Sequence, residues 1–384
     1  MKVGIEAQRL FRPQKHGMDR VALEFIKHLQ EIDKVNEYFI FVKPDVDNQI
    51  ISNTQNFKIV EIHGGPYPIW EQFKLPKQVK AHKCDVLHCT SNTAPLHSEI
   101  PIITTLHDII FKETSLFRIL ISKASWYQKL GNIYRRLIVS NVISKSKKLI
   151  TVSHHERKNI RAKYNLENEK IRTIYNGVSE KFNTKIDLNS KEEIKRKYRL
   201  PDKFLLHIGN TDPRKNTARV FESFQEFIKT TNKETKLVVI GLGLEKVASI
   251  VRAISIKPEV YKRIICLGYI ADDELPCVYS LAQMFLFPSL REGFGIPILE
   301  AMACGVPVIT SNVSSMPEVA GDAACLVNPK STASLVKAIK KIDSDTNYRK
   351  RLIQKGLHRH TLFSWENMSK DILKVYKEFN TENT

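Results

Sequence analysis

The stretch Pro288–Pro307, PSLREGFGIPILEAMACGVP, decides the fold of this chain. It follows the short apolar run Met284–Phe287, which predicts a buried strand. Pro297 suits the first turn of a helix, and Gly305 suits its end. The stretch therefore predicts a strand, a loop and a helix in succession, as in a parallel α/β domain.

Two glutamates and two glycines in this stretch point to ligand binding. Glu292 lies in the predicted loop, and Glu300 lies within the predicted helix. Gly293 and Gly295 flank a phenylalanine, so the backbone there can approach a ligand closely. A helix N-terminus also presents N–H groups to anions. We expect carboxylates to face one ligand here from two sides.

Apolar runs and amphipathic stretches alternate on both sides of a polar segment, 183–200. The predicted strands before it are Met1–Ala7, Tyr38–Val42, Phe57–Ile62, Val86–Cys89, Ile102–Thr105 and Leu149–Val152. Those after it are Phe204–Ile208, Leu237–Ile240, Ile264–Leu267, Met284–Phe287, Val308–Thr310 and Cys325–Val327. The predicted helices include Arg20–Ile32, Val220–Lys229, Ala333–Lys341 and Trp365–Phe379. The pattern predicts two similar α/β domains joined by a linker, with ligands beyond the carboxyl ends of the strands.

Length and composition agree with this reading. A chain of 384 residues favours two domains, and 42% hydrophobic with 26% charged residues is typical of a globular protein. The formal charge of +19 favours anionic partners. The six cysteines form no C-x-x-C pair, which indicates reduced residues of a cytosolic protein. We expect no signal peptide and no membrane-spanning helix.

The segment EGFGIPILEAMACGVPVI resembles the signature of retaining glycosyltransferases of family 4, in which seven residues separate two glutamates. Further segments match this family in the expected order: TTLHD at 104–108, ITVSHHERKNI at 150–160, IYNGV at 174–178, HIGNTDPRKN at 207–216, PEVAGDAACLVNP at 317–329 and FSWENMSKDILKVYKEF at 363–379. The resemblance covers nearly the whole chain.

The resemblance implies the GT-B fold, an α/β architecture of two Rossmann-like domains facing each other across a cleft, with a C-terminal helix that crosses back to the first domain. It implies an acceptor-binding domain at 1–182, a linker at 183–200, a nucleotide-sugar-binding domain at 201–362 and a crossover helix at 363–384. It further implies that a hexose is transferred from a nucleotide sugar with retention, without a metal or another cofactor.

The resemblance also implies roles for individual residues. Lys215 matches the lysine that binds the donor diphosphate, because a leaving group that gains negative charge needs fixed cations and oriented N–H dipoles. Glu292 matches the glutamate beside the transferred sugar, and Glu300 matches the one that bonds the ribose diol. His107 matches a histidine near the reacting centre, which Asp108 is a candidate to orient.

The other candidates are donor contacts. An arginine usually follows the glycine at the end of the lysine-loop strand, but Asn210 stands there, and Arg214 is a candidate substitute. Gly17 opens the first long helix and is a candidate contact for the donor phosphate or the acceptor. The sugar loop and the base pocket add Gly293, Phe294, Gly295, Ile296, Gly268, Tyr269 and Ile270.

Eight basic residues and no acidic residue lie between Glu113 and Glu156. The basic side chains that would fall within about 20° of one another on a continuous helix are Arg118, Lys129, Arg136 and Lys147. Apolar residues, Trp126 among them, would form another face. This pattern predicts an interfacial helix that binds an anionic membrane, at its cytoplasmic face. A solvated basic face over a buried apolar one, with a break at Gly131, is the alternative.

Two other functions fit parts of the sequence. A glycoside hydrolase would use Glu292 and Glu300 as its carboxylates, but it has no diphosphate for Lys215 to hold. The charge of +19 suggests a polyanion- or nucleic-acid-binding protein, yet no nucleic-acid-binding signature occurs. The form TDPRKN resembles mannosyl- and related transferases that use GDP-sugars, and UDP-sugars remain open. We expect a glycan or lipid-linked acceptor in cell-surface polysaccharide or glycolipid synthesis, and no nucleic acid.

Overall fold

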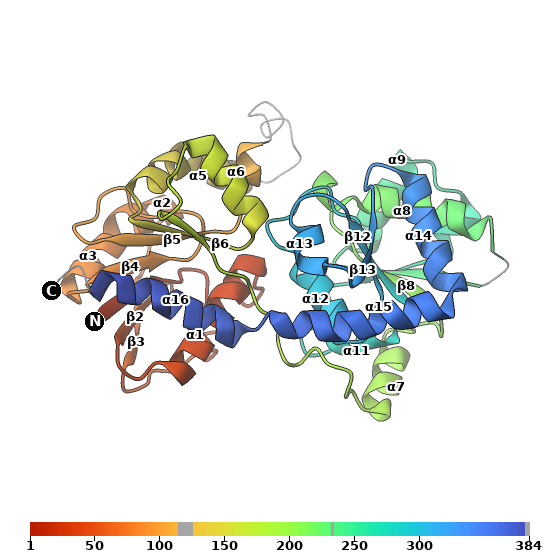
Figure 1. Ribbon diagram of the computed structural model, residues 1–384, viewed down its shortest axis with the longest axis horizontal. Coiled ribbons are helices and arrows are strands. Elements are labelled where there is room, and N and C mark those ends of the chain that lie inside the picture. Colours follow the sequence, from red (N-terminus) through yellow and green to blue (C-terminus); the bar gives the residue numbers. More distant parts are fainter. Residues whose placement is uncertain (114–125, 232–233, 381–384) are drawn as a thin grey trace. The chain divides into compact units, whose positions relative to one another are not determined.

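The computed structural model describes residues 1–113, 126–231 and 234–380, and these form two compact units (Figure 1). The first unit contains Met1–Gly177 together with the segment that begins at Trp365, and the second contains Val178–Ser364. Each unit is a parallel sheet with helices packed against it. The prediction of an α/β fold with two Rossmann-like domains is confirmed.

The sheet of the first unit has the strand order β3-β2-β1-β4-β5-β6-β7, and all of its strand pairs are parallel. The strands are β1 (Lys2–Glu6), β2 (Glu37–Val42), β3 (Phe57–Glu61), β4 (Val86–Cys89), β5 (Ile102–Leu106), β6 (Lys148–Thr151) and β7 (Ile171–Thr173). The helices are α1 (Gly17–Ile32), α2 (Tyr67–Ile69), α3 (Leu75–Ala81), α5 (Trp126–Lys145), α6 (His154–Tyr164) and α16 (Trp365–Asn380), with a π-helical turn at Trp70–Lys74 and a 3-10 turn at Ile110–Lys112. The central strands β4 and β5 are buried throughout because helices cover both faces of such a sheet.

The sheet of the second unit has the order β10-β9-β8-β11-β12-β13 and is also parallel. Its strands are β8 (Phe204–Ile208), β9 (Lys236–Ile240), β10 (Ile264–Gly268), β11 (Met284–Phe287), β12 (Val308–Ser311) and β13 (Ala324–Val327). Its helices are α7 (Leu188–Lys197), α8 (Thr217–Ile228), α9 (Leu244–Ala253), α10 (Pro258–Tyr261), α11 (Leu275–Leu281), α12 (Ile296–Ala303), α13 (Met316–Ala320), α14 (Thr332–Ser344) and α15 (Thr346–Arg359), with 3-10 turns at Pro213–Lys215 and His360–Leu362.

The polar segment 183–200 contains the helix α7, which Asp187 caps by accepting a hydrogen bond from the Ser190 N–H. The hydroxyl of Tyr198 donates to Glu274 at 2.6 Å, so this segment is fastened to the second unit. The structure also groups 178–182 with the second unit, whereas the sequence-based boundary places these residues in the first domain.

The helix α16 completes the first unit, as the resemblance implies. It packs against α1, and the Ser369 hydroxyl donates to the carbonyl of Phe25. Its Tyr376 is fully buried, with its hydroxyl 2.6 Å from Nδ1 of His88 on β4. His88 is also buried, and its Nε2 lies 2.8 Å from the hydroxyl of Thr105. Within the described residues, no helix has both the length and the apolar character needed to cross a membrane.

Tyr376→Phe should lower the free energy of unfolding of the first unit by about 1–3 kcal/mol, because it leaves Nδ1 of buried His88 without its partner. Urea denaturation followed by circular dichroism measures the change. Lys374→Ala alters an exposed position on the same helix and serves as the control. Equal stability of Tyr376→Phe and the parent protein would show that this contact does not hold α16 in place.

Candidate functional site

The lysine loop joins β8 to α8 at the carboxyl edge of the second sheet. A Cβ atom at Gly209 would lie 2.7 Å from Cγ1 of Val239, so only glycine fits where the strand ends. Asp212 caps the 3-10 turn by accepting a hydrogen bond from the backbone N–H of Arg214 at 2.9 Å. Asn216 adopts a left-handed conformation with φ of 60°. These local constraints direct the side chain of Lys215 along the carboxyl edge.

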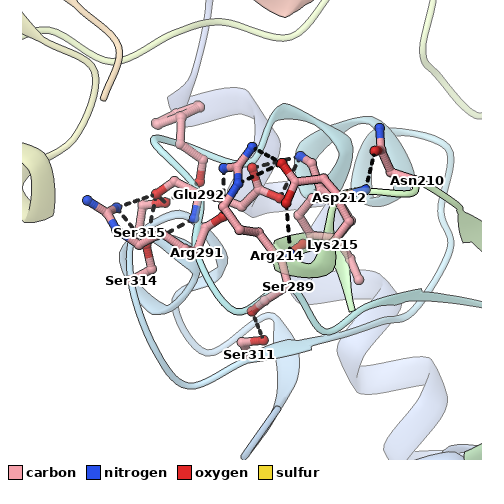
Figure 2. A network of polar contacts seen from close by, with 12 residues as sticks. Asn210, Asp212, Arg214, Lys215, Ser289, Arg291, Glu292, Ser311, Ser314 and Ser315 are labelled. Atoms are coloured by element: carbon pink, nitrogen blue, oxygen red, sulfur yellow. Dashed lines mark hydrogen bonds and ion pairs between the residues drawn. The ribbon is translucent and has the colours of Figure 1, made fainter. Parts of the chain in front are cut away.

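The loop after β11 carries Glu292 and is held by residues that follow β12. The hydroxyls of Ser314 and Ser315 lie 2.8 and 3.1 Å from the carbonyl oxygen of Glu292. The guanidinium of Arg291 donates to the same carbonyl at 3.0 Å and to the Ser314 hydroxyl at 3.1 Å. Figure 2 shows these contacts beside the lysine loop. The backbone around Glu292 is therefore fixed before any ligand binds.

Lys215 and Glu292 form an ion pair that joins the two loops (Figure 2). Nζ of Lys215 lies 2.7 Å from Oε1 and 2.8 Å from Oε2 of Glu292. The two side chains are 27% and 10% exposed, so the pair is largely shielded from solvent. The ammonium group also lies 5.7 Å above the ring centroid of Phe287. The ammonium group of Lys215 is thus already bound by the Glu292 carboxylate. An incoming anion would compete with that carboxylate for the lysine.

The helix α12 begins directly after this pair. Gly295, with φ of 116°, is its N-cap, and Pro297 stands in its first turn. The helix therefore starts at Ile296, with its first N–H groups directed to the carboxyl edge of the sheet. Gly293 lies next to Glu292 in the same loop. The ring of Phe294 is buried against Phe363, so its contribution to a ligand would come from the backbone.

Glu300 lies on α12 and is 7% exposed. Its Oε2 accepts a hydrogen bond from the hydroxyl of Tyr279, a fully buried residue of α11, at 3.0 Å. A buried carboxylate with one oxygen fixed in this way is suited to accept hydrogen bonds from a vicinal diol.

The remaining candidates of the second unit differ in their surroundings. Arg214 pairs with Asp212 at 2.8 Å, so its charge is shared within its own loop. Gly268 ends β10 with φ of 67°, and a Cβ atom there would meet open space. Tyr269 is 62% exposed, whereas Ile270 is buried. Gly268 and Tyr269 therefore lie at an accessible part of the carboxyl edge.

Two family models divide the chain between them. The model for Glycosyltransferase Family 4 matches residues 16–182, and the model for Glycosyl transferases group 1 matches residues 190–359. This chain is a family 4, group 1 glycosyltransferase.

Curated relatives of the glycosyltransferase include two from bacterial cell-surface synthesis. The chain is 29% identical over 380 residues to O-antigen chain mannosyltransferase B of Escherichia coli, covering 94% of this chain and 96% of the relative. It is 27% identical over 339 residues to O-antigen chain mannosyltransferase RfbU of Salmonella typhimurium, covering 85% and 87%.

Solved structures agree with the fold of the glycosyltransferase. WaaG, a glycosyltransferase involved in lipopolysaccharide biosynthesis, superposes with a TM-score of 0.73 at 15% identity, covering 98% of this chain and 99% of that one. HepE of Anabaena, in complex with UDP and glucose, gives 0.72 at 15% identity, covering 98% and 100%.

The other two candidates, His107 and Gly17, belong to the first unit of the glycosyltransferase. Nε2 of His107 lies 2.9 Å from the carbonyl oxygen of Thr90, so Nε2 carries the proton and Nδ1 is the acceptor. Burial lowers the pKa of His107, which keeps the ring neutral. The carboxylate of Asp108 accepts from the N–H of Ile110. Gly17 is the first residue of α1, and a Cβ atom there would meet nothing within 4 Å.

Two buried carboxylates of the first unit were not singled out from the sequence. Glu6 ends β1, and burial followed by the charge of Glu71 raises the pKa of Glu6 to about 7. Glu71 lies in the π-helical turn and accepts hydrogen bonds from the hydroxyls of Tyr67, Tyr134 and Thr93. The end of β1 therefore carries a group that titrates near neutral pH.

Sequence reasoning also missed the residues that hold Glu300 and the loops of Lys215 and Glu292 in place. These are Tyr279, Arg291, Ser314, Ser315 and Asn216, whose side-chain amide donates to the carbonyls of Pro288 and Pro329. Ser314 and Ser315 follow a predicted strand, so their place at a carboxyl edge could have drawn attention. The pattern around Tyr279 is that of an ordinary core helix and gave no such signal.

Lys215→Ala should lower kcat/KM for sugar transfer by about 100- to 1000-fold, because it removes a fixed cation from the site of the developing negative charge. Steady-state kinetics with the purified variant measure the loss. Lys229→Ala, at an exposed lysine that follows α8, is the matched control and should retain parental turnover. Near-parental turnover by a folded Lys215→Ala protein would contradict this assignment.

Proposed function

We propose that this glycosyltransferase transfers a hexose, with mannose as the first candidate, from a nucleotide sugar onto a glycan or a lipid-linked acceptor. The observation that carries the proposal is the Lys215–Glu292 pair at the carboxyl edge, with Glu300 on the helix that follows. The names of the O-antigen relatives support mannose. HepE is described with UDP, so both GDP- and UDP-sugars are candidate donors.

The donor diphosphate would bind where Lys215 now contacts Glu292. A diphosphate carries more negative charge than one carboxylate, so it competes for the ammonium group and releases Glu292. The released carboxylate of Glu292 accepts hydrogen bonds from hydroxyls of the transferred sugar. Glu300, with Oε2 held by Tyr279, accepts from the ribose diol. Gly268, Tyr269 and Ile270 contact the base.

We further propose that transfer proceeds without a divalent metal and with retention of configuration. Lys215 and the first N–H groups of α12 supply positive charge as the bond between the anomeric carbon and the phosphate oxygen breaks. The acceptor oxygen attacks from the same face and passes its proton to the departing phosphate. Nδ1 of His107 accepts a hydrogen bond from a sugar hydroxyl, because its ring is neutral and its Nε2 is already engaged.

Peripheral binding to a membrane at the cytoplasmic face is the last part of this proposal. The helix α5 continues through Gly131, and its side chains Trp126, Leu130 and Leu137 are 69%, 48% and 70% exposed. These three positions fall within about 40° of one another around the helix axis. Exposed apolar side chains on a basic helix are what an anionic bilayer surface binds. Arg118 of the predicted basic face lies outside the described residues.

The product made from an α-linked donor should show the α value of the one-bond coupling between C1 and H1 in its NMR spectrum, because the coupling between H1 and H2 does not separate the two anomers of mannose. Turnover should be unchanged in excess EDTA. A β coupling in the initial product would overturn retention. Loss of turnover in EDTA, restored by magnesium or manganese, would overturn metal independence. Release of free sugar from simple glycosides without any nucleotide sugar would favour the hydrolase instead.

The double variant Lys129→Glu with Arg136→Glu should bind vesicles of phosphatidylcholine and phosphatidylglycerol at least about 30-fold more weakly than the parent, because each basic residue near an anionic surface contributes about 1 kcal/mol and the new carboxylates are repelled. Co-sedimentation at several salt concentrations measures this. The control, Lys337→Glu with Lys340→Glu, makes the same charge change at exposed positions of α14. Equal binding by the α5 variant and the parent would refute membrane contact through this helix.

A further inference from the structure

A large groove lies at the amino edge of the sheet in the first unit. Its volume is about 1020 Å³, and α3, the β4–β5 connection and the residues that precede β6 line it. Cys84, Pro101 and Lys147 line it just before β4, β5 and β6 begin. Thr90 and His107 follow the other ends of β4 and β5. Strands of four and five residues thus separate the groove from the carboxyl edge, a span of roughly 15 Å.

The rim of the groove is strongly basic. Its lysines, all exposed, are Lys77, Lys80, Lys83, Lys145 and Lys147. Among the described residues that line it, Glu99 is the single carboxylate, and it pairs with Lys80 at 2.8 Å. Both side chains of this pair are at least 70% exposed, so the pair is weak and opens readily to a stronger anion. The rim therefore favours a ligand with more than one negative charge.

The floor of the groove is apolar. Val79 and Ile102 belong to the buried core of the unit, and Leu96 and Ile100 pack against that core. Pockets for small organic ligands span about 300–1000 Å³, so this groove has room for a hydrocarbon segment as well as a phosphate group. The described lining contains no phenylalanine, tyrosine or tryptophan on which a base would stack, which argues against nucleic acid.

We propose that this groove binds the phosphate-bearing end of a lipid, in which an isoprenoid or acyl chain carries a monophosphate or diphosphate. The inference rests on the proposed function, in which the acceptor is lipid-linked. Lysine ammonium groups bind phosphate as point charges, and the apolar floor removes the first part of the chain from water. A free phosphate ion would make no use of the apolar floor, and an uncharged lipid would make no use of the positive charge of the rim.

The segment between β4 and β5 connects this groove to the carboxyl edge. Its first residue, Thr90, holds His107 through its carbonyl, whereas Leu96 and Ile100 line the groove. Gln72 fixes the middle of the segment, with Nε2 donating to the carbonyl of Ala94 and Oε1 accepting from the N–H of Leu96. A glycan attached to a lipid phosphate in the groove would extend along this fixed segment toward His107.

Calorimetry with farnesyl diphosphate tests the inference, using Lys215→Ala protein so that the donor site does not bind the probe. The probe should bind at least 10-fold more tightly than either inorganic diphosphate or farnesol. Adding Lys80→Glu with Lys83→Glu should weaken its binding at least 10-fold, whereas Lys337→Glu with Lys340→Glu should not change it. Ile100→Asn should weaken binding of farnesyl diphosphate but not of inorganic diphosphate.

Three results would overturn the inference: equal affinity for inorganic and farnesyl diphosphate, undiminished binding by the Lys80→Glu, Lys83→Glu protein, or equally tight binding of hexaglutamate, which would indicate a protein partner. A photoreactive farnesyl diphosphate should label residues 76–83 or 95–102 of the parent chain, a measurement that needs no variant to fold. Sugar transfer by the parent protein to a soluble acceptor tests the proposed function separately. Absence of that transfer would refute the proposed function, whereas the binding data would still show whether the groove binds a lipid phosphate.

Discussion

The ion pair between Lys215 and Glu292 is the contact on which the candidate site of the second unit depends. It joins the loop after β8 to the loop after β11, which are 77 residues apart in sequence. Removing one partner would leave the other charge in a largely enclosed place, which is costly. The backbone hydrogen bond from Leu290 to the Arg214 carbonyl and the amide contacts of Asn216 hold the same two loops together. The two loops are thus held together without a ligand, and in the proposed function the donor diphosphate would take the place of the Glu292 carboxylate at Lys215.

In the first unit, buried titratable groups and exposed lysines lie at opposite edges of one sheet. Two buried groups with shifted pKa values lie at the carboxyl edge, where Glu6 ends β1 and His107 follows β5. Exposed lysines gather at the amino edge, around the groove. Parallel strands place all of their carboxyl ends on one side of the sheet. The buried titratable groups at that edge are therefore kept a strand length away from the exposed lysines at the amino edge.

The sequence predicts most strands of the two sheets because these strands are buried and mainly apolar. Lys236–Ile240 and Phe204–Ile208 illustrate this, since the apolar pattern predicts each to within one residue. The pattern misses the strand β7 because Ile171–Thr173 has only three residues, of which one is fully buried. The helix α5 runs through Gly131, where the sequence allows a break, because buried residues of its second half, such as Val139 and Val142, pack in the core and outweigh the low helix propensity of one glycine.

Side-chain partnerships in the site could be predicted only in part. Lys215 and Glu292 were both expected to contact the donor, but their contact with each other depends on how two distant loops meet. The bond from Tyr279 to Glu300 joins two helices that no sequence spacing relates. The carboxylate of Asp108, a candidate to orient His107, accepts a hydrogen bond from the N–H of Ile110, because an aspartate side chain readily bonds a backbone N–H two residues further along the chain.

The membership of α16 in the first unit has a consequence for synthesis of the protein on the ribosome. His88 is translated early, but Tyr376, its buried partner, is translated only after the whole of the second unit, Val178–Ser364. At about 5–20 residues per second, that interval lasts on the order of 10–40 s. During it, the face of the first sheet that α16 later covers stays exposed on the nascent chain. The first domain to begin folding is therefore the last to be completed, and chaperones have that interval in which to bind the exposed face.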